Sequence, residues 1–325
     1  RLCPQAIWTH GHFDRYREVS AQVMAILAEE TPRVERVSID EAFIDITPGR
    51  FAPEDPLLVA RRISDRVAAL GVTCSIGVGC NKTVAKPFGL TIVRPGTEQR
   101  FLAALPVSAM SGIGRSAEER LRRMRIYTLG ELSRAPESTL ASIFGVNGER
   151  MRQRALGLEI SEVTSLDEER EVKSVSNERT FAKDLTERGD IEAAIALLGE
   201  SVGRRLRRQG LTGATVTLKL KYSYGSGRSA QRRLPHPTDD ENIFVAVALE
   251  LLDNIWQEGM HVRLAGIGMS DFDHQGGIQT DLFCEVDDRG AQSSDRRELS
   301  VAIDAVRDKF GDTALSFGRQ SRFND

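Results

Sequence analysis

The chain has 325 residues, and its 44 Lys and Arg against 47 Asp and Glu give a formal net charge of −3. It contains no run of about 18 apolar residues, which excludes a membrane span, and its first residues lack the pattern of a signal peptide. A net charge near zero gives no sign of a nucleic-acid partner, but it averages over the two or three domains that this length predicts. The four cysteines show no C-x-x-C spacing, so we expect free thiols in a cytoplasmic protein.

The first hundred residues alternate helical and strand patterns. Apolar residues recur at helical spacing in two stretches, and the segment VERVSIDEAFIDITPG between them has the alternation of short strands. The predicted elements are helices at 19–27, 56–71 and 81–86, strands at 72–79 and 89–96, and a hairpin whose two strands join at 38–41. This alternation predicts an α/β or α+β domain over residues 1–103.

The rest of the chain divides into a helical region, a linker and a second α/β domain. Short helices with glycine-containing turns fill 104–164, and the polar, glycine-free stretch 165–172 is typical of a linker. Residues 173–273 predict two helices on one face of a four-stranded antiparallel sheet. The elements expected there are strands at 173–181, 214–222, 231–235 and 262–272, and helices at 190–210 and 242–259. The tail 274–325 is mostly polar and ends in a helix at 295–310.

Asp40 and Glu41 are the first candidate catalytic residues. Adjacent carboxylates at a strand turn are good hard-oxygen ligands for Mg²⁺, and two-metal phosphoryl transfer needs several such ligands. A solvated acidic turn is the alternative, and the pair alone favours it. The flanking apolar strands of SIDEAFIDIT favour the functional interpretation.

Two further motifs could hold phosphate groups. Lys82 and Lys86 lie four residues apart on the short helix expected at 81–86, and a helix N-terminus with a lysine can bind phosphate oxygens. Gly112 and Gly114 in SGIGRSAEERL fit a helix–hairpin–helix turn, whose backbone N–H groups grip a DNA phosphate without reading sequence. The alternatives are a solvated lysine pair and an ordinary tight turn between helices.

A long basic run lies between Glu200 and Asp239, with nine basic residues and no acidic one. Its members are Arg204, Arg205, Arg207, Arg208, Lys219, Lys221, Arg228, Arg232 and Arg233. Lys219 and Lys221 share one face of their strand, and such a face suits the backbone of a duplex. A solvated face is the alternative. Further on, Gln279-Thr280-Asp281-Leu282-Phe283 places two apolar residues in a polar tail, where they could dock into a partner or pack on their own domain.

Five segments together have the order and spacing of a known family: SIDEAFIDIT, GVGCNKTVAK, KPFGLTIVRPG, LPVSAMSGIGRSAEERL and IYTLGEL. They resemble the Y-family translesion DNA polymerases of the bacterial DNA polymerase IV type, and the resemblance covers nearly the whole chain. It implies a multidomain α+β polymerase. Its expected parts are an incomplete palm at 1–103, a helix–hairpin–helix thumb at 104–164, a linker at 165–172, a DNA-binding little finger at 173–273 and a tail at 274–325.

The resemblance also implies roles for individual residues. Asp40 corresponds to the metal-binding aspartate of the second catalytic motif, and Glu41 to the acid nearest the primer 3′ end. Lys86 matches one of two family lysines, of which one touches the incoming triphosphate. The basic residues expected to track the template–primer backbone are Lys219, Lys221, Arg228, Arg232 and Arg233, with Gly112 and Gly114 in the thumb. Gln279, Leu282 and Phe283 look like the anchors of a peptide that binds the bacterial sliding clamp.

The sequence departs from the family in three places. The opening segment with the first catalytic aspartate and the fingers is missing, NKTVAKPFGL is shorter than usual, and KYSYGSGRSAQRR replaces an aspartate- and threonine-rich strand. One hypothesis explains the first two departures: the sequence omits segments that the gene encodes. A gene that contains both segments would support it, and a gene that begins near Arg1 would contradict it.

The resemblance implies template-directed DNA synthesis past damaged bases, without proofreading. The expected cofactor is two Mg²⁺ ions, and the expected partners are primer–template DNA, dNTP and the sliding clamp, with no membrane. We expect a cytoplasmic monomer. The alternative is a non-catalytic DNA- and clamp-binding accessory protein on the same scaffold, which the missing third carboxylate favours. A nucleotide cyclase shares the carboxylate pair, but the thumb-like hairpin and the basic second domain speak against it.

Overall fold

The computed structural model describes residues 3–7, 9–48, 54–85, 89–165, 168, 171–272, 289–311 and 314–315, and from 289 to 297 it describes the backbone alone. The chain forms two compact units, Arg1–Glu169 and Arg170–Asp325. The boundary between them falls within the range that the sequence assigns to a linker. No helix among the described residues is long and apolar enough to cross a membrane.

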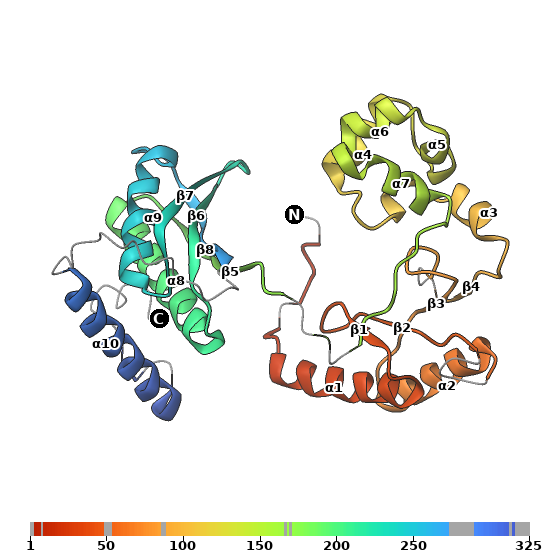
Figure 1. Cartoon of the computed structure of the whole chain (residues 1–325), viewed down its shortest axis with the longest axis horizontal. Coiled ribbons are helices and arrows are strands. Elements are labelled where there is room, and N and C mark those ends of the chain that lie inside the picture. Colours follow the sequence, from red (N-terminus) through yellow and green to blue (C-terminus); the bar gives the residue numbers. More distant parts are fainter. Residues whose placement is uncertain are drawn as a thin grey trace, which may run out of the picture. The chain divides into compact units, whose positions relative to one another are not determined.

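The first unit begins with two helices that pack against a small hairpin (Figure 1). Helices α1 (Phe13–Glu30) and α2 (Pro56–Ala69) share a core of Ile26, Val59, Ile63 and Val67. Asp55 caps α2 by accepting a hydrogen bond of 2.8 Å from the N–H of Leu57. Strands β1 (Val34–Arg36) and β2 (Ala42–Ile44) pair antiparallel, which confirms the hairpin predicted around 38–41.

The region after α2 differs from its sequence prediction. Strands β3 (Ile76–Val78) and β4 (Leu90–Ile92) pair in parallel, and both are shorter than expected. The predicted helix at 81–86 is wrong over its described part, since residues 82–84 form a turn. The Asn81 side chain accepts a hydrogen bond of 3.0 Å from the N–H of Val84 and so closes this turn in place of a helix. Lys86 lies outside the described residues.

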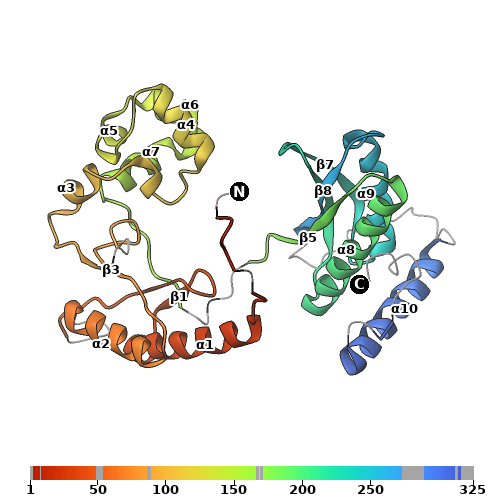
Figure 2. The same ribbon diagram turned by 180° about the vertical axis from the view of Figure 1, so that it is seen from behind.

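Short helices then build a separate cluster in the first unit (Figures 1 and 2). They are α3 (Glu98–Ala103), α4 (Arg115–Arg123), α5 (Leu129–Arg134), α6 (Glu137–Phe144) and α7 (Gly148–Ala155), with 3₁₀ turns at Val107–Ala109 and Gly145–Asn147. Thr128 and Glu131 form a reciprocal capping box at the start of α5. Val84 and Val93 belong to the same buried cluster, so the core of the helical region includes residues from before 104.

The second unit confirms the predicted sheet with two helices on one face. Strands β5 (Ser174–Leu185), β6 (Gly213–Tyr222), β7 (Gly227–Thr238) and β8 (Val262–Phe272) pair antiparallel in the order β5-β8-β6-β7. Helices α8 (Arg188–Gln209) and α9 (Glu241–Ile255) bury their apolar residues against alternate residues of the strands, such as Val216, Leu218 and Ile267. Gly210 ends α8 in the left-handed conformation, at the residue where the sequence predicts the end of this helix.

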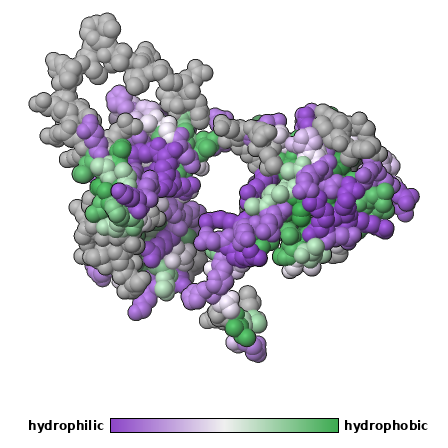
Figure 3. Space-filling model, turned by 90° about the horizontal axis from the view of Figure 1, so that it is seen from below, coloured by the Kyte–Doolittle hydropathy of each residue, from purple (hydrophilic) through white to green (hydrophobic). Residues whose placement is uncertain are grey.

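The last helix, α10 (Arg289–Phe310), begins six residues earlier than the sequence predicts and belongs to the second unit. None of its residues joins the apolar core of that unit among the described side chains. It is held by polar contacts instead, which are described below. On the face that Figure 3 shows, hydrophilic residues cover most of the described surface, and apolar residues form smaller scattered patches.

Candidate active site and nucleic-acid interface

Asp40 and Glu41 lie in the loop of the β1–β2 hairpin, and both are exposed. The Glu41 carbonyl accepts hydrogen bonds from the N–H groups of Val37 (2.9 Å) and Ser38 (3.1 Å), which closes the loop. The Ser38 hydroxyl donates to Oδ1 of Asp40 at 2.5 Å and accepts from the Asp40 N–H at 3.3 Å. The loop thus holds one carboxylate oxygen of Asp40 and leaves its other oxygen open to solvent.

Helix α1 fixes this loop from the other side. The Ser20 hydroxyl donates to the carbonyl of Ile39, directly before Asp40. Arg36 donates from Nη2 to the Ser20 hydroxyl at 3.2 Å and from Nε to the carbonyl of Ser38 at 3.1 Å. Two side chains from separate elements therefore hold the backbone on the N-terminal side of the carboxylate pair.

The donor chemistry of the loop fits a hard divalent cation, because two exposed carboxylates stand next to each other in a fixed loop. They form only part of a ligand set. Over the described ranges there is no group of three or more His, Cys, Asp or Glu side chains that could hold a metal ion. Asp40 and Glu41 are the residues of this part of the chain that would contribute ligands.

Lys82 makes an ion pair inside the first unit. Its ammonium donates to Oε2 of Glu35 on β1, and it lies 5.7 Å from the ring centroid of Phe43 on β2. Glu35 also accepts from the N–H of Thr164 at 3.1 Å. Burial raises the pKa of Glu35, but the Lys82 ammonium and the Thr164 N–H outweigh it and hold the pKa below its ordinary value of 4.5. Lys82 is therefore engaged in an ion pair within the fold, and the proposal of a phosphate-binding lysine concerns Lys86.

Gly112 and Gly114 form the turn that the sequence predicts before α4. Gly112 has a φ of +92°, a conformation that favours glycine, and Gly114 is the N-cap of α4 with no side-chain cap. A Cβ added at Gly114 would meet no atom within 4 Å, so the start of the helix is open there. The N–H groups of the first turn of α4 can be reached by a ligand from this side.

The open face of the second sheet carries three of the five basic residues proposed for DNA. Since residues next to buried Leu218 and Leu220 point away from the helices, Lys219 and Lys221 lie on the open face. Arg233 joins them, because it pairs directly with Thr215 of β6. Glu178 of β5 forms an ion pair of 2.7 Å with Lys219, so the charge of this lysine is partly neutralised.

The other two residues lie on the opposite face. Arg232 pairs with buried Val216 and Arg228 with buried Leu220, so both side chains leave the sheet on the side of the helices. Arg232 forms an ion pair there with Glu250 of α9. The five residues proposed for DNA therefore do not share one surface, because neighbours along a strand alternate between faces.

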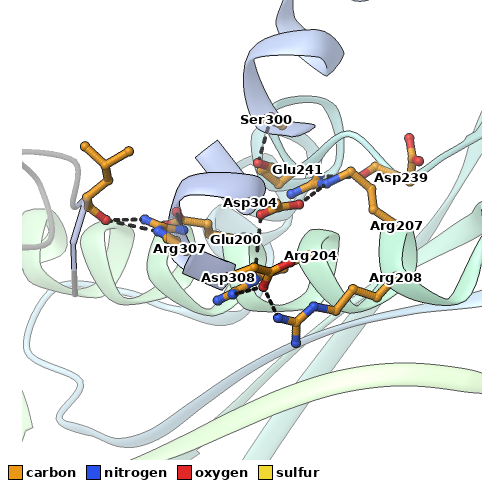
Figure 4. A network of polar contacts seen from close by, with 11 residues as sticks. Glu200, Arg204, Arg207, Arg208, Asp239, Glu241, Ser300, Asp304, Arg307 and Asp308 are labelled. Atoms are coloured by element: carbon orange, nitrogen blue, oxygen red, sulfur yellow. Dashed lines mark hydrogen bonds and ion pairs between the residues drawn. The ribbon is translucent and has the colours of Figure 1, made fainter. Parts of the chain in front are cut away.

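Three arginines of α8 also face away from the open face of the sheet, toward α10: Arg204, Arg207 and Arg208 (Figure 4). Arg207 donates from Nε to Oδ2 of Asp304 at 2.7 Å and from Nη1 to Glu241 at the start of α9. Arg204 and Arg208 both donate to Oδ1 of Asp308, Arg204 at 2.7 Å. Three arginines of the acid-free run therefore bind acids outside the run, at separations of up to 104 residues, between Arg204 and Asp308.

One more ion pair joins α8 and α10 with the charges exchanged, so that the arginine lies on α10 and the acid on α8. Arg307 of α10 pairs with Glu200 of α8 and donates to the carbonyl of Leu315 at 3.0 Å from Nε and 2.6 Å from Nη2. The Ser300 hydroxyl donates to Oε1 of Glu241 at 3.1 Å. The two arginines that bind Asp308 lower its carboxyl pKa below the ordinary value, so the acid stays charged. Charges of both signs on both helices specify one way for α10 to dock.

A shallow groove along β8 was not predicted from the sequence. It has a volume of about 210 Å³ and runs over Gly266 and Gly268, between β5 and β6. Its walls include Ser174, Ser176, Glu178, Thr217, Lys219 and Ser270. The segment GIGMS could have predicted this groove, because small residues at every second position of a strand leave its backbone exposed on one face. The predicted peptide anchors Gln279, Leu282 and Phe283 lie outside the described residues.

The chain is similar to known proteins in sequence and in fold. The family model described as impB/mucB/samB family matches residues 1–88, and the model of its C-terminal domain matches residues 172–282. A DNA polymerase IV of Oceanobacillus iheyensis is 32% identical, with 97% of this chain and 76% of that protein covered. A DNA polymerase IV of Lactococcus lactis subsp. cremoris is 35% identical, with 83% of this chain and 76% of that protein covered.

Solved structures share the fold. A Y-family DNA polymerase chimera of Dbh and Dpo4 superposes with a TM-score of 0.69 at 22% sequence identity, with 83% of this chain and 80% of that chain covered. The two matched family models together span more than half of the chain, and the similar relatives exceed 30% identity. The chain therefore belongs to the impB/mucB/samB family, the Y-family DNA-directed DNA polymerases of the bacterial DNA polymerase IV type.

Proposed function

We propose that the protein carries out template-directed DNA synthesis past damaged bases by two-metal nucleotidyl transfer at Asp40 and Glu41. The observation that carries the proposal is the placement of this pair, exposed in a hairpin loop that α1 and Arg36 hold in place. The primer 3′-OH would attack the α-phosphate of a dNTP, a P–O bond would form, and the bond to the pyrophosphate leaving group would break.

The chain's own residues would position the reactants. Asp40 would supply carboxylate oxygens to two Mg²⁺ ions, one oxygen being already oriented by the Ser38 hydroxyl. Glu41 would lie closest to the primer 3′-OH, and Lys86 would bind the triphosphate. The metal ions, when bound, would neutralise charge that develops on the transferred phosphoryl group.

Two separate surfaces would hold the primer–template backbone. In the first unit, the open start of α4 after Gly112 and Gly114 offers N–H groups to a phosphate. In the second unit, Lys221, Arg233 and Lys219 would face the duplex along the groove over β8. Contacts of this kind follow the backbone, so the template base would specify the inserted nucleotide.

The remaining assignments complete the proposal. Gln279, Leu282 and Phe283 would anchor the protein to the bacterial sliding clamp, since an exposed Leu and Phe pair can fill a partner's pocket. The protein would act as a monomer in the cytoplasm, where bacterial DNA is copied. Synthesis without proofreading is part of the proposal, and the given sequence contains no exonuclease motif.

Primer extension by the full-length protein tests the proposal. We expect Asp40→Asn to lower the rate of extension by at least about 100-fold, the loss typical for removing a group that stabilises the transition state. Asp45→Asn is the matched control on the same hairpin, because asparagine can still accept the hydrogen bonds from Thr47. A wild-type protein that binds primed DNA but extends no primer would contradict the polymerase assignment and support the accessory role.

A further inference from the structure

Arg154 of α7 joins two loops of the first unit that are far apart in sequence. Its Nη1 donates to the carbonyl of Ser111 at 2.7 Å, directly before Gly112 of the phosphate-binding turn. Its Nε donates to the Thr83 hydroxyl at 3.1 Å and to Oε2 of Glu159 at 3.2 Å. The Thr83 hydroxyl in turn donates to the same Glu159 oxygen at 2.6 Å. The side chains of Arg154 and Glu159 are 16% and 9% exposed, so this contact is shielded from water.

The loop that contains Thr83, residues 81–85, is itself fixed on both sides. On one side, the Asn81 side chain donates to the carbonyl of Gly157 at 2.8 Å, and Val84 is buried in the helical core. On the other side, Lys82 pairs with Glu35 of β1, the strand that leads into the loop of Asp40 and Glu41. A continuous series of contacts therefore runs from the Ser111 carbonyl through Arg154 to Thr83, along the backbone to Lys82, and on to Glu35 of the carboxylate hairpin.

We infer that Arg154 is a positioning residue that sets the distance between the phosphate-binding turn and the carboxylate pair. This inference rests on the proposed function of both loops. If the turn at Gly112 grips the DNA backbone, then the loop at 81–85 decides where the primer end falls relative to Asp40. Arg154 acts through the Ser111 carbonyl and the Thr83 hydroxyl and touches neither DNA nor nucleotide.

Arginine is required for the bridge because its planar guanidinium presents donors in two directions at once. Nε serves Thr83 and Glu159, while Nη1 serves Ser111. A lysine keeps the charge and can satisfy Glu159, but its single ammonium cannot span both loops. Displacing reacting groups by about 1 Å can cost about 100-fold in rate, so the loss of the bridge should appear in the chemical step.

The test measures single-turnover insertion of one nucleotide by Arg154→Lys, Thr83→Val and the double variant, at saturating DNA and dNTP. We expect each single variant to insert about 10- to 100-fold more slowly. The double variant should be no slower than either, because both changes break one connection. The dissociation constant for primed DNA should stay within about threefold of wild type, with the same dependence on salt. Arg150→Lys is the matched control, since Arg150 lies on the same helix, pairs with Glu159 at 3.5 Å and contacts neither loop.

Several results would overturn the inference. An unchanged insertion rate in both single variants would remove the positioning role. Weaker DNA binding with a salt slope lower by about one would make Arg154 a phosphate contact. A smaller fraction of active protein with an unchanged rate would make its role purely structural. If the wild type inserted no nucleotide, the proposed function would fail together with the inference, whereas a slow Arg154→Lys beside an equally slow Arg150→Lys would refute the inference alone.

Discussion

Replacing Arg207 by methionine should release α10 from the second unit, because this guanidinium connects three helices. Arg207 lies on α8 and binds Asp304 of α10 and Glu241 of α9, and its side chain is 7% exposed. Without it, the side chains of Asp304 and Glu241, which are 14% and 13% exposed, face each other with no cation between them. Arg207→Met keeps most of the side-chain volume and removes the charge.

The expected cost follows from this burial. Removing one partner of a buried ion pair costs about 3–5 kcal/mol, because a charge is left buried and unpaired. The Ser300 hydroxyl still binds Glu241, and Arg204 lies 3.9 Å from Asp304, so we expect the lower end of this range. About 3 kcal/mol corresponds to about a 100-fold change in the equilibrium between docked and released α10.

Arg208 provides a control on the same helix. It also binds an aspartate of α10, but it is 56% exposed and its partner Asp308 is 51% exposed. A pair that water screens in this way contributes about 0–1 kcal/mol. Arg208→Met should therefore shift the same equilibrium by less than about fivefold.

Hydrogen exchange of the full chain, followed by mass spectrometry, measures this equilibrium directly. Backbone amides of 298–311 should exchange about 100-fold faster in Arg207→Met than in wild type, while amides of the central strand β8 keep their rates. Equal effects of Arg207→Met and Arg208→Met would refute the reasoning that burial decides the strength of these pairs. Unchanged exchange in Arg207→Met would show that α10 does not depend on this contact.

Three further outcomes can be checked separately. Gly112→Ala should lower the free energy of unfolding by about 1 kcal/mol and weaken primed-DNA binding, because alanine is strained at a φ of +92°. Gly114→Ala should leave the thermal unfolding temperature unchanged, because the added Cβ meets no atom within 4 Å. Lys221→Ala should reduce the salt slope of DNA binding by about one, and Arg232→Ala should leave that slope unchanged, as titrations at several salt concentrations would reveal. The pKa of Glu35 is lower in the folded protein than its ordinary value of 4.5, so its ion pair with Lys82 should stabilise the fold fully above pH 4.5. This stabilisation should be lost as the pH falls through the folded-state pKa, which NMR titration of the Glu35 carboxyl group would follow.

The sequence predicted the elements whose pattern is local. The alternation in VERVSIDEAFIDIT gave the hairpin and placed Asp40 in its loop, and the helical spacing of 190–210 gave α8 with its glycine stop. The antiparallel sheet with two helices on one face followed from the same periodicities. Each of these features depends on residues within one or two turns or strands of each other.

The features that failed depend on residues far away in the chain. The acid-free run around Arg207 suggested a DNA surface, but Arg207 binds two acids outside the run, Glu241 of α9 and Asp304 of α10, which follow it by 34 and 97 residues. Residues 82–84 form a turn where distant residues hold them: the Asn81 side chain donates to the carbonyl of Gly157, 76 residues later, and Val84 is buried in the helical core. The face on which Arg232 lies depends on the register of the edge strand, which pairs Arg232 with Val216, and no local pattern in the sequence specifies that register.

The contacts that dock α10 should appear as correlated substitutions among related sequences. Arg207 is buried and bound to an acid at the start of α9 and another on α10, so neither helix can change its charge alone without isolating a buried partner. We expect positions 204, 207 and 208 to vary together with 304 and 308 among relatives that keep this helix. A relative whose chain ended after β8 would gain little from arginine at 207 and should carry an apolar or small polar residue there.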